Sequence, residues 1–249
     1  MVKNIAKGMV QNMEKDQKQD NAIRSFLMIG QSNMAGRGEF DDVEEIRNPL
    51  CFMLRTGLWI PMREPVNPDH PIFNDYWHSG VSLASTFADE AAKDLNKKIG
   101  LIPCAHGGTS IDQWMPGELL YDHAVAMTKL AMRTSKFSGI LWHQGEQDCV
   151  SEEQLRAHKE KFVKMITALR KDLDAENLPL IIGELSEIGM SGAEHGQMNE
   201  QYREIVKNLP CCRLVSSKGL TMKADNIHFN AVSFCEFGKR YYQAYKDLL

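Results

Sequence analysis

Short apolar segments alternate with longer amphipathic segments along most of the chain. Five short segments are almost entirely apolar, as is typical of parallel strands covered on both faces: residues 23–29, 99–104, 139–142, 180–183 and 212–215. Apolar residues at helical spacing predict helices at residues 81–97, 119–133, 152–173, 199–209 and 231–249. This alternation predicts an α/β fold, a three-layer α/β/α sandwich around a central parallel sheet.

Residues 37–80 interrupt the alternation. They contain five of the nine prolines, so we expect a long irregular segment there. Within it, residues 52–54 and 59–62 predict a small hairpin. Residues 1–22 are polar and mixed in charge, and we expect them to form an N-terminal arm. Residues 23–249 then form a single domain with enough apolar material for a core.

Composition excludes several classes of partner. The net charge of −4 is spread along the chain, so we expect no nucleic-acid partner, which would need a basic face. No segment approaches the roughly 18 apolar residues of a membrane span, and residues 1–22 lack the apolar stretch of a secretory signal. We therefore expect a cytoplasmic protein without a membrane partner. The six cysteines form no CxxC pair and are expected to be reduced.

Polar and titratable residues follow the apolar segments. The carboxyl ends of parallel strands meet at one edge of a sheet, where ligands bind in folds of this class. Such residues follow all five segments, directly or after a short loop: Gln31, Ser32 and Asn33; His106, Gly107 and Gly108; Gln144 and Glu146; Glu184 and Ser186; Asp225 and His228. Their convergence on one edge is what an active site requires.

Ser32, His228 and Asp225 can form a catalytic triad. A serine becomes a nucleophile when a histidine takes its proton and a carboxylate orients that histidine. Each residue also has a plain structural interpretation, with Ser32 capping a helix after the first strand and Asp225 capping the last helix. The Gly-x-Ser-x-Gly elbow of the α/β-hydrolases is absent, because position 34 is Met.

Three groups can bind an oxyanion beside Ser32. They are the backbone N–H of Ser32, the backbone N–H of Gly107 or Gly108, and the side-chain amide of Gln144. Donors aimed at a developing negative charge are a large term in acyl transfer.

A metal site is the competing interpretation of some of the same residues. His106, His143, Glu146 and Asp148 are possible ligands, but the His-x-x-Glu spacing has no partner motif. We therefore expect no metal. Glu146 and Asp148 are expected to orient neighbouring loops or cap the helix that starts near Ser151, and His143 to be structural.

The candidate residues lie in four blocks: residues 30–36 (GQSNMAG), 107–114 (GGTSIDQW), 142–146 (WHQGE) and 225–229 (DNIHF). With these blocks in this order, the chain resembles the SGNH hydrolase superfamily. Within it, the chain is similar to carbohydrate esterase family six, which includes acetyl xylan esterases and relatives of sialate O-acetylesterase. The blocks extend over nearly the whole chain.

This resemblance implies a flavodoxin-like α/β/α fold and a Ser-His-Asp triad without metal or other cofactor. It implies that Ser32 is the nucleophile, with His228 and Asp225 as its partners. The implied reaction removes acetyl groups from sugar hydroxyls. Gln144 stands where many members of the superfamily carry Asn, and Asn226 where Gly is common in this branch; Asn also tolerates a left-handed backbone.

The expected substrate is an acetylated carbohydrate. Acetylated xylan, other oligosaccharides and sialic acid acetates remain open, as does the oligomeric state. Two other functions also remain open: an SGNH lipase, thioesterase or lysophospholipase, and an inactive sugar-binding protein. Trp59, Trp77 and Trp114 can stack on sugar faces, although each also fits a core position. Five residues are expected to bind substrate or support the site: Gln31, Asn33, His106, Glu146 and Trp114.

Overall fold

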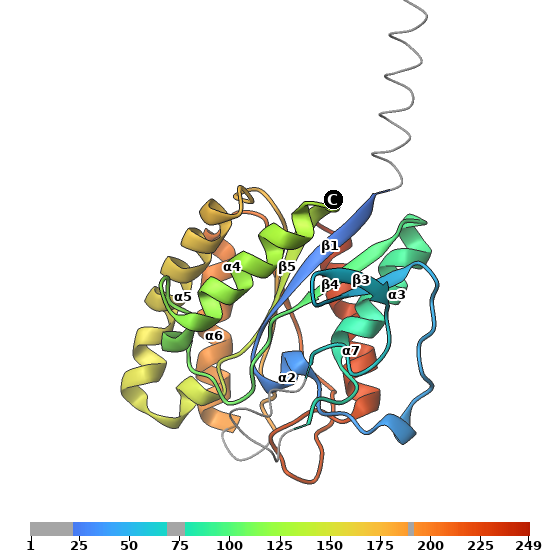
Figure 1. Ribbon diagram of the computed structural model, residues 1–249. Helices are drawn as coiled ribbons and strands as arrows, with labels where there is room; N and C mark the ends of the chain where they lie inside the picture. Colours follow the sequence, from blue (N-terminus) through green and yellow to red (C-terminus); the bar gives the residue numbers. More distant parts are fainter. Residues whose placement is uncertain (1–21, 69–77, 189–191) are drawn as a thin grey trace, which may run out of the picture.

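A central sheet organises the computed structural model, which describes residues 22–68, 78–188 and 192–249. Within these residues the sheet has seven strands in the order β3-β2-β4-β1-β5-β6-β7 (Figure 1). Neighbouring strands are parallel except for the antiparallel pair β2 and β3. The strands are β1 (Ile23–Gly30), β2 (Cys51–Arg55), β3 (Leu58–Pro61), β4 (Ile99–Pro103), β5 (Ser135–His143), β6 (Leu180–Gly183) and β7 (Cys212–Val215).

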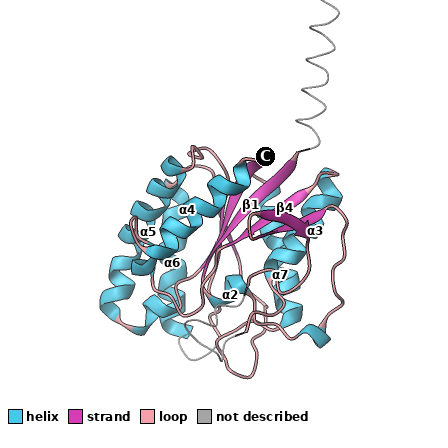
Figure 2. Ribbon diagram, viewed as in Figure 1, coloured by secondary structure: helices cyan, strands magenta, loops and turns pink. Residues whose placement is uncertain are grey.

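Helices cover both faces of the sheet (Figures 1 and 2). One layer contains α4 (Leu119–Met132), α5 (Glu152–Asp172) and α6 (Gly192–Asn208), and the other contains α3 (Leu83–Leu95) and α7 (Ala231–Lys246). Each layer encloses its own apolar core, with Trp142 and Phe162 in the first and Phe26 and Phe87 in the second. The predicted three-layer, flavodoxin-like α/β/α fold is confirmed.

The strand order reverses at β1. From β1 the chain reaches β4 on one side of it, and then β5, β6 and β7 on the other side. Open α/β sheets bind ligands at the carboxyl ends of the strands where this reversal occurs. The short helix α2 (Ser32–Ala35) lies at that point, directly after β1 (Figure 1).

The structure differs from the predicted elements in three places. The predicted hairpin exists, but β2 pairs with β4, so the hairpin extends the main sheet. β5 begins at Ser135, earlier than its apolar segment, because residues 135–137 pair with β1 although Ser135 and Lys136 have polar side chains. α6 begins at Gly192, before the apolar periodicity becomes clear. Of the expected N-terminal arm, only Ala22 lies within the described residues.

The cysteines and helices bear on two further expectations. All six cysteines lie in the described ranges and are free. Burial raises the pKa of the Cys51, Cys104 and Cys212 thiols to about 12, so these thiols stay protonated. Among the described helices, none combines the length and the apolar character needed to cross a membrane.

Replacing Gly30 should destabilise the fold. Gly30 ends β1 with a φ of +131°, and a methyl group on its Cα would lie 2.0 Å from the His143 carbonyl oxygen. We expect Gly30→Ala to lower the free energy of unfolding by about 3 kcal/mol or more, through backbone strain and the clash. Urea unfolding measures this loss.

Gly196→Ala is the matched control. Gly196 lies in α6, and a Cβ there would contact nothing within 4 Å. Alanine is the better helix former, so this change should leave stability unchanged or raise it by about 1 kcal/mol. Equal losses in the two variants would contradict the role assigned to the β1–β5 contact.

Candidate active site

The turn after β1 carries Ser32. The Gln31 N–H donates to the His143 carbonyl at 2.9 Å, which holds the turn against β5. Gln31, and not Ser32, is the N-cap of α2. Ser32 is therefore the first helical residue, whose backbone N–H has no acceptor within the helix. The helix-capping interpretation of Ser32 is wrong, and its hydroxyl remains available for chemistry.

Ser32, His228 and Asp225 form one hydrogen-bonded chain. His228 Nε2 lies 2.9 Å from Ser32 Oγ, and His228 Nδ1 lies 2.8 Å from Asp225 Oδ2. Ser32 and His228 are 3% and 4% exposed, so this contact is shielded from solvent. The order of atoms is the one by which a carboxylate orients a histidine and the histidine takes the serine proton.

The turn around Asp225 fixes its carboxylate. Asp225 Oδ1 accepts the backbone N–H groups of Ile227 at 2.9 Å and His228 at 3.0 Å. Burial alone raises the pKa of Asp225, but these bonds and the His228 side chain outweigh it and lower the pKa below its usual value. Asn230, and not Asp225, caps α7 by accepting the Ser233 N–H. The helix-cap interpretation of Asp225 is therefore wrong.

Asn33 joins the serine turn to the histidine loop. Its Nδ2 donates to Glu146 Oε1 at 2.7 Å and to the Ile227 carbonyl at 3.2 Å. Its Oδ1 accepts the Phe229 N–H at 3.2 Å. Ile227 and Phe229 flank His228, so one side chain positions the backbone on both sides of the histidine.

Glu146 fixes the Asn33 side chain by accepting its hydrogen bond. Burial by itself raises the pKa of Glu146, but the hydrogen bond and charge of His143, with the bond from Asn33, outweigh it and lower the pKa to about 2. His143 is the last residue of β5 and is fully buried, and its Nε2 lies 3.5 Å from Glu146 Oε1. These contacts are those of a loop-orienting carboxylate and a structural histidine.

Gly107 is the glycine that lies beside Ser32. A methyl group built on Gly107 would be 3.6 Å from Ser32 Cβ and 2.7 Å from Arg37 Nη2, whereas one on Gly108 would contact nothing within 4 Å. Gly108 supplies the turn, with a φ of +71°. Of the two glycines, Gly107 is therefore the one adjacent to Ser32.

Arg37 is a residue of the site that no sequence motif indicates. Its Nη1 donates to the Gly36 carbonyl at 2.6 Å, which turns the guanidinium toward Gly107. The available signal was its place, directly after the block that ends at Gly36. A cation so close to a candidate nucleophile bears on the charge of the substrate.

The structure corrects the expected role of Gln144. Its Nε2 donates one hydrogen to the Thr109 carbonyl at 2.9 Å and the other to Asp148 Oδ2 at 2.5 Å. An amide nitrogen has only two hydrogens, so none remains for an oxyanion. Gln144 instead connects the loop after β5 to the loop after β4.

Trp114 does not stack on a sugar. It is 1% exposed, packs edge-on against Trp142, and donates Nε1–H to Thr109 Oγ1 at 3.1 Å. It therefore supports the Thr109 loop from the core. Trp59 lies against Gly100 in β4 and belongs to the packing of the sheet. Trp77 lies outside the described residues.

The remaining expected residues, Gln31 and His106, lie in the loops after β1 and β4. Gln31 Oε1 accepts the Gln147 N–H at 3.4 Å, which links the turns after β1 and β5. His106 is half-buried after β4, with Nδ1 3.2 Å from the Gly107 carbonyl.

Across residues 22–68, 78–188 and 192–249, no group of three or more His, Cys, Asp or Glu side chains is arranged to hold a metal ion.

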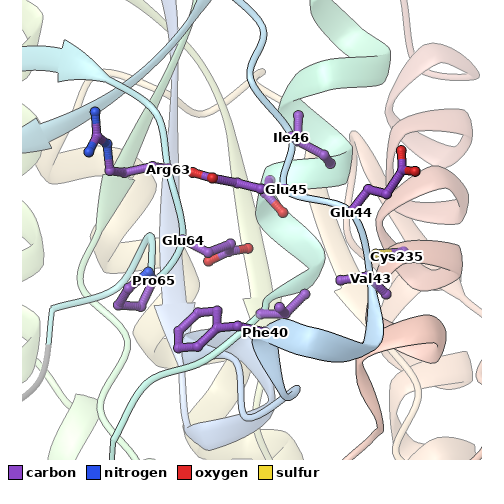
Figure 3. Close-up of a pocket in the computed structure, with 11 residues that line it drawn as sticks. Phe40, Val43, Glu44, Glu45, Ile46, Arg63, Glu64, Pro65 and Cys235 are labelled. Carbon is purple, nitrogen blue, oxygen red and sulfur yellow. The ribbon is translucent and has the colours of Figure 1, made fainter.

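A separate cavity of about 450 Å³ lies beside the α3–α7 layer (Figure 3). Phe40, Pro65 and Glu64 line one side of it, and Val43 and Cys235 the other. The Glu64 carboxylate is already bonded, since it accepts N–H and O–H bonds from the start of α3 and an N–H from residue 66. Glu64 therefore holds the residues after β3 against α3.

A polar cavity of about 550 Å³ lies after β6 and β7, on the same sheet edge as Ser32. Glu184, Ser217 and Arg203 are among its lining residues. Arg203 donates to Glu184 Oε1 at 2.6 Å and also bonds Glu200, so its charge is already compensated.

The chain is similar to known carbohydrate esterases. Residues 22–247 match the family described as carbohydrate esterase, sialic acid-specific acetylesterase. The probable carbohydrate esterase At4g34215 of Arabidopsis thaliana is 30% identical over 238 residues, which cover 88% of this chain and 89% of that protein. The X-ray structure of the Arabidopsis protein has a TM-score of 0.80 at 27% identity, covering 91% of this chain and 98% of the other. The crystal structure of NanS has a TM-score of 0.73 at 18% identity, with coverage of 92% and 98%, and supports the fold.

Replacing Glu146 should change how stability depends on pH. Because its pKa falls from 4.5 to about 2 on folding, the ionised carboxylate stabilises the protein above about pH 4.5. That contribution is lost as the pH falls toward 2, and a shift of this size corresponds to about 3 kcal/mol. We expect Glu146→Gln to be less stable at pH 7 and to have a flatter acid limb, measured by urea unfolding from pH 7 to pH 3.

The matched control is Glu153→Gln, an exposed residue in the first turn of α5. It should follow the pH dependence of the parent protein. A Glu146→Gln curve parallel to the parent curve would show that the folded state does not lower this pKa.

Proposed function

The chain belongs to the carbohydrate esterase family of sialic acid-specific acetylesterases, and from this membership we propose that it removes O-acetyl groups from sugars through Ser32, His228 and Asp225. The chain is a carboxylic ester hydrolase of the carbohydrate acetylesterase kind. The observation that carries the mechanism is the hydrogen-bonded chain of these three side chains, with steps of 2.9 and 2.8 Å.

The first step is acylation of Ser32. Ser32 Oγ attacks the acetyl carbonyl carbon while His228 Nε2 takes the hydroxyl proton. Asp225 stabilises the resulting imidazolium through Nδ1–H, and its lowered pKa keeps it ionised at neutral pH. The negative oxygen of the tetrahedral intermediate is stabilised by the backbone N–H groups of Ser32 and Gly107.

Loss of the sugar completes acylation, and hydrolysis of the acetyl-enzyme is the second step, which returns the enzyme to its starting state. The His228 imidazolium donates its proton to the sugar oxygen, the C–O bond breaks, and the sugar leaves with its hydroxyl restored. Water then attacks the acetyl-enzyme while His228 again acts as base. Acetate leaves, and the proton returns to Ser32 Oγ.

Arg37 favours an acetylated sugar that carries a carboxylate. Its guanidinium lies against Gly107, beside the reacting serine. Guanidinium groups bind carboxylates through paired hydrogen bonds, and a neutral xylan chain offers no such partner. The geometry and the family description therefore support an O-acetylated sialic acid as substrate, with acetylated xylan as the alternative.

Loss of either Ser32 or His228 should abolish turnover. We expect Ser32→Ala and His228→Ala to lower kcat by about 10⁴- to 10⁶-fold. Acetate release from an aryl acetate and from O-acetylated sialic acid measures the loss, and circular dichroism checks folding. Ser216→Ala and the exposed His123→Ala are matched controls that should keep parent activity. A folded variant of Ser32 or His228 that keeps more than about one-hundredth of the parent kcat would contradict the triad.

Arg37→Gln should discriminate between charged and neutral substrates. Loss of a charged hydrogen bond corresponds to about 10- to 100-fold in affinity. We expect KM for O-acetylated sialic acid to rise by that factor, with little change for a neutral aryl acetate. Arg47→Gln, at an exposed site, is the control. Equal losses on both esters, or a parent enzyme that prefers acetylated xylo-oligosaccharides, would contradict the carboxylate-bearing substrate.

A further inference from the structure

A second buried carboxylate lies beneath the loop that carries Gly107. Asp148 is fully buried in the 3-10 helix η3 (Gln147–Val150). The Ile111 N–H lies 3.1 and 3.0 Å from its two oxygens, Gln144 Nε2 donates to Oδ2, and His158 Nδ1 lies 3.1 Å from Oδ2. Asp148 thus gathers donors from the loop after β4, the loop after β5 and α5.

The other side of the His158 ring faces Tyr202. His158 Nε2 lies 3.0 Å from the Tyr202 hydroxyl oxygen, and both residues are fully buried. The same hydroxyl donates to the Gln144 carbonyl at 2.6 Å and accepts the Trp142 Nε1–H at 3.0 Å. His158 is therefore enclosed by polar groups at both ring nitrogens.

The hydrogen bonds of this network favour a positively charged His158 ring. The buried Tyr202 hydroxyl keeps its single hydrogen, because burial raises its pKa well above the usual value. That hydrogen is donated to the Gln144 carbonyl, the shorter of the two contacts. Nε2 of His158 must then be the donor to the hydroxyl oxygen. Nδ1 faces Oδ2 of Asp148, and it is the donor of that contact when Asp148 is a carboxylate, the form that matches the hydrogen bonds that Asp148 accepts from Ile111 and Gln144.

We infer that Asp148 and His158 form a buried carboxylate–imidazolium pair that positions Gln144 and residues 107–111 for the reaction at Ser32. The role in the reaction rests on the proposed function, because Gly107 is an oxyanion donor only if Ser32 is the nucleophile. Neither residue contacts the triad, so both are positioning residues.

The pair acts on the loop at two backbone points. Asp148 holds the Ile111 N–H directly and holds the Thr109 carbonyl through Gln144. Both points lie within four residues of Gly107. Small displacements of an oxyanion donor are costly, because its hydrogen bond must reach the transition state with the correct geometry. A buried carboxylate without a compensating cation would itself be strongly destabilising.

The protonation state of His158 can be measured without turnover. We expect the NMR spectrum of the protein labelled with ¹⁵N-histidine, at pH 8, to contain one ring with both nitrogens protonated. That signal should be absent in His158→Gln. It should be shifted in Tyr202→Phe, which keeps the His158 ring but removes the hydroxyl oxygen that faces its Nε2. The Tyr202→Phe assignment stands even if His158→Gln does not fold. A His158 ring with one unprotonated nitrogen at pH 8 would overturn the charged pair.

The positioning role requires a kinetic test. We expect Tyr202→Phe to lower kcat for an aryl acetate by about 10-fold or more, with KM within about 2-fold of the parent value. Tyr242→Phe is the matched control, because its hydroxyl bonds Asp94 in the α3–α7 layer, and it should change neither constant. An effect on KM alone, or equal effects in the two variants, would overturn the positioning role. The NMR result does not depend on Ser32, so failure of the triad and failure of the charged pair are separate outcomes.

Discussion

The hydrogen bonds of Asn33 join the two loops on which the active site depends. The nucleophile lies after the first strand and the histidine lies 196 residues later, just before the last helix. Asn33 bonds the backbone on both sides of His228 and is itself held by Glu146. The hydrogen bonds of Asn33 therefore hold Ser32 and His228 at their 2.9 Å separation, which does not depend on these two side chains alone.

Two buried carboxylates that follow β5, those of Glu146 and Asp148, stabilise the loops at this edge of the sheet. Glu146 supports the triad side through Asn33, and Asp148 supports the Gly107 side through Gln144 and Ile111. β5 is suited to this because it pairs with β1 on one side and β6 on the other, close to the reversal of strand order. Burying ionised groups costs free energy, so each carboxylate is bonded to several donors.

The sheet positions the chemistry by bringing strand ends close together. Gly30 can approach the His143 carbonyl because it has no Cβ, and this close contact sets the path of the turn that carries Ser32. Gly107 permits a similar approach, because a Cβ there would lie 2.7 Å from Arg37 Nη2 and 3.6 Å from Ser32 Cβ. The site thus consists of short turns on rigid strands, which is how α/β folds combine a stable core with exposed reactive groups.

Periodicity and position along the chain were enough to predict the layered α/β fold and the convergence of Ser32, Asp225 and His228 on one edge. Both follow from local burial patterns and from the rule that parallel strands end together. The tertiary structure alone decided which glycine lies beside Ser32 and that the hairpin joins the main sheet. It also placed Arg37 against Gly107, and His158 and Tyr202 in the core beneath the loop after β5. It also decided that Gln144 connects two loops. Both hydrogens of its amide nitrogen are donated, one to the Thr109 carbonyl and one to the Asp148 carboxylate. Such choices depend on side-chain contacts between distant segments, which leave no periodic trace in the sequence.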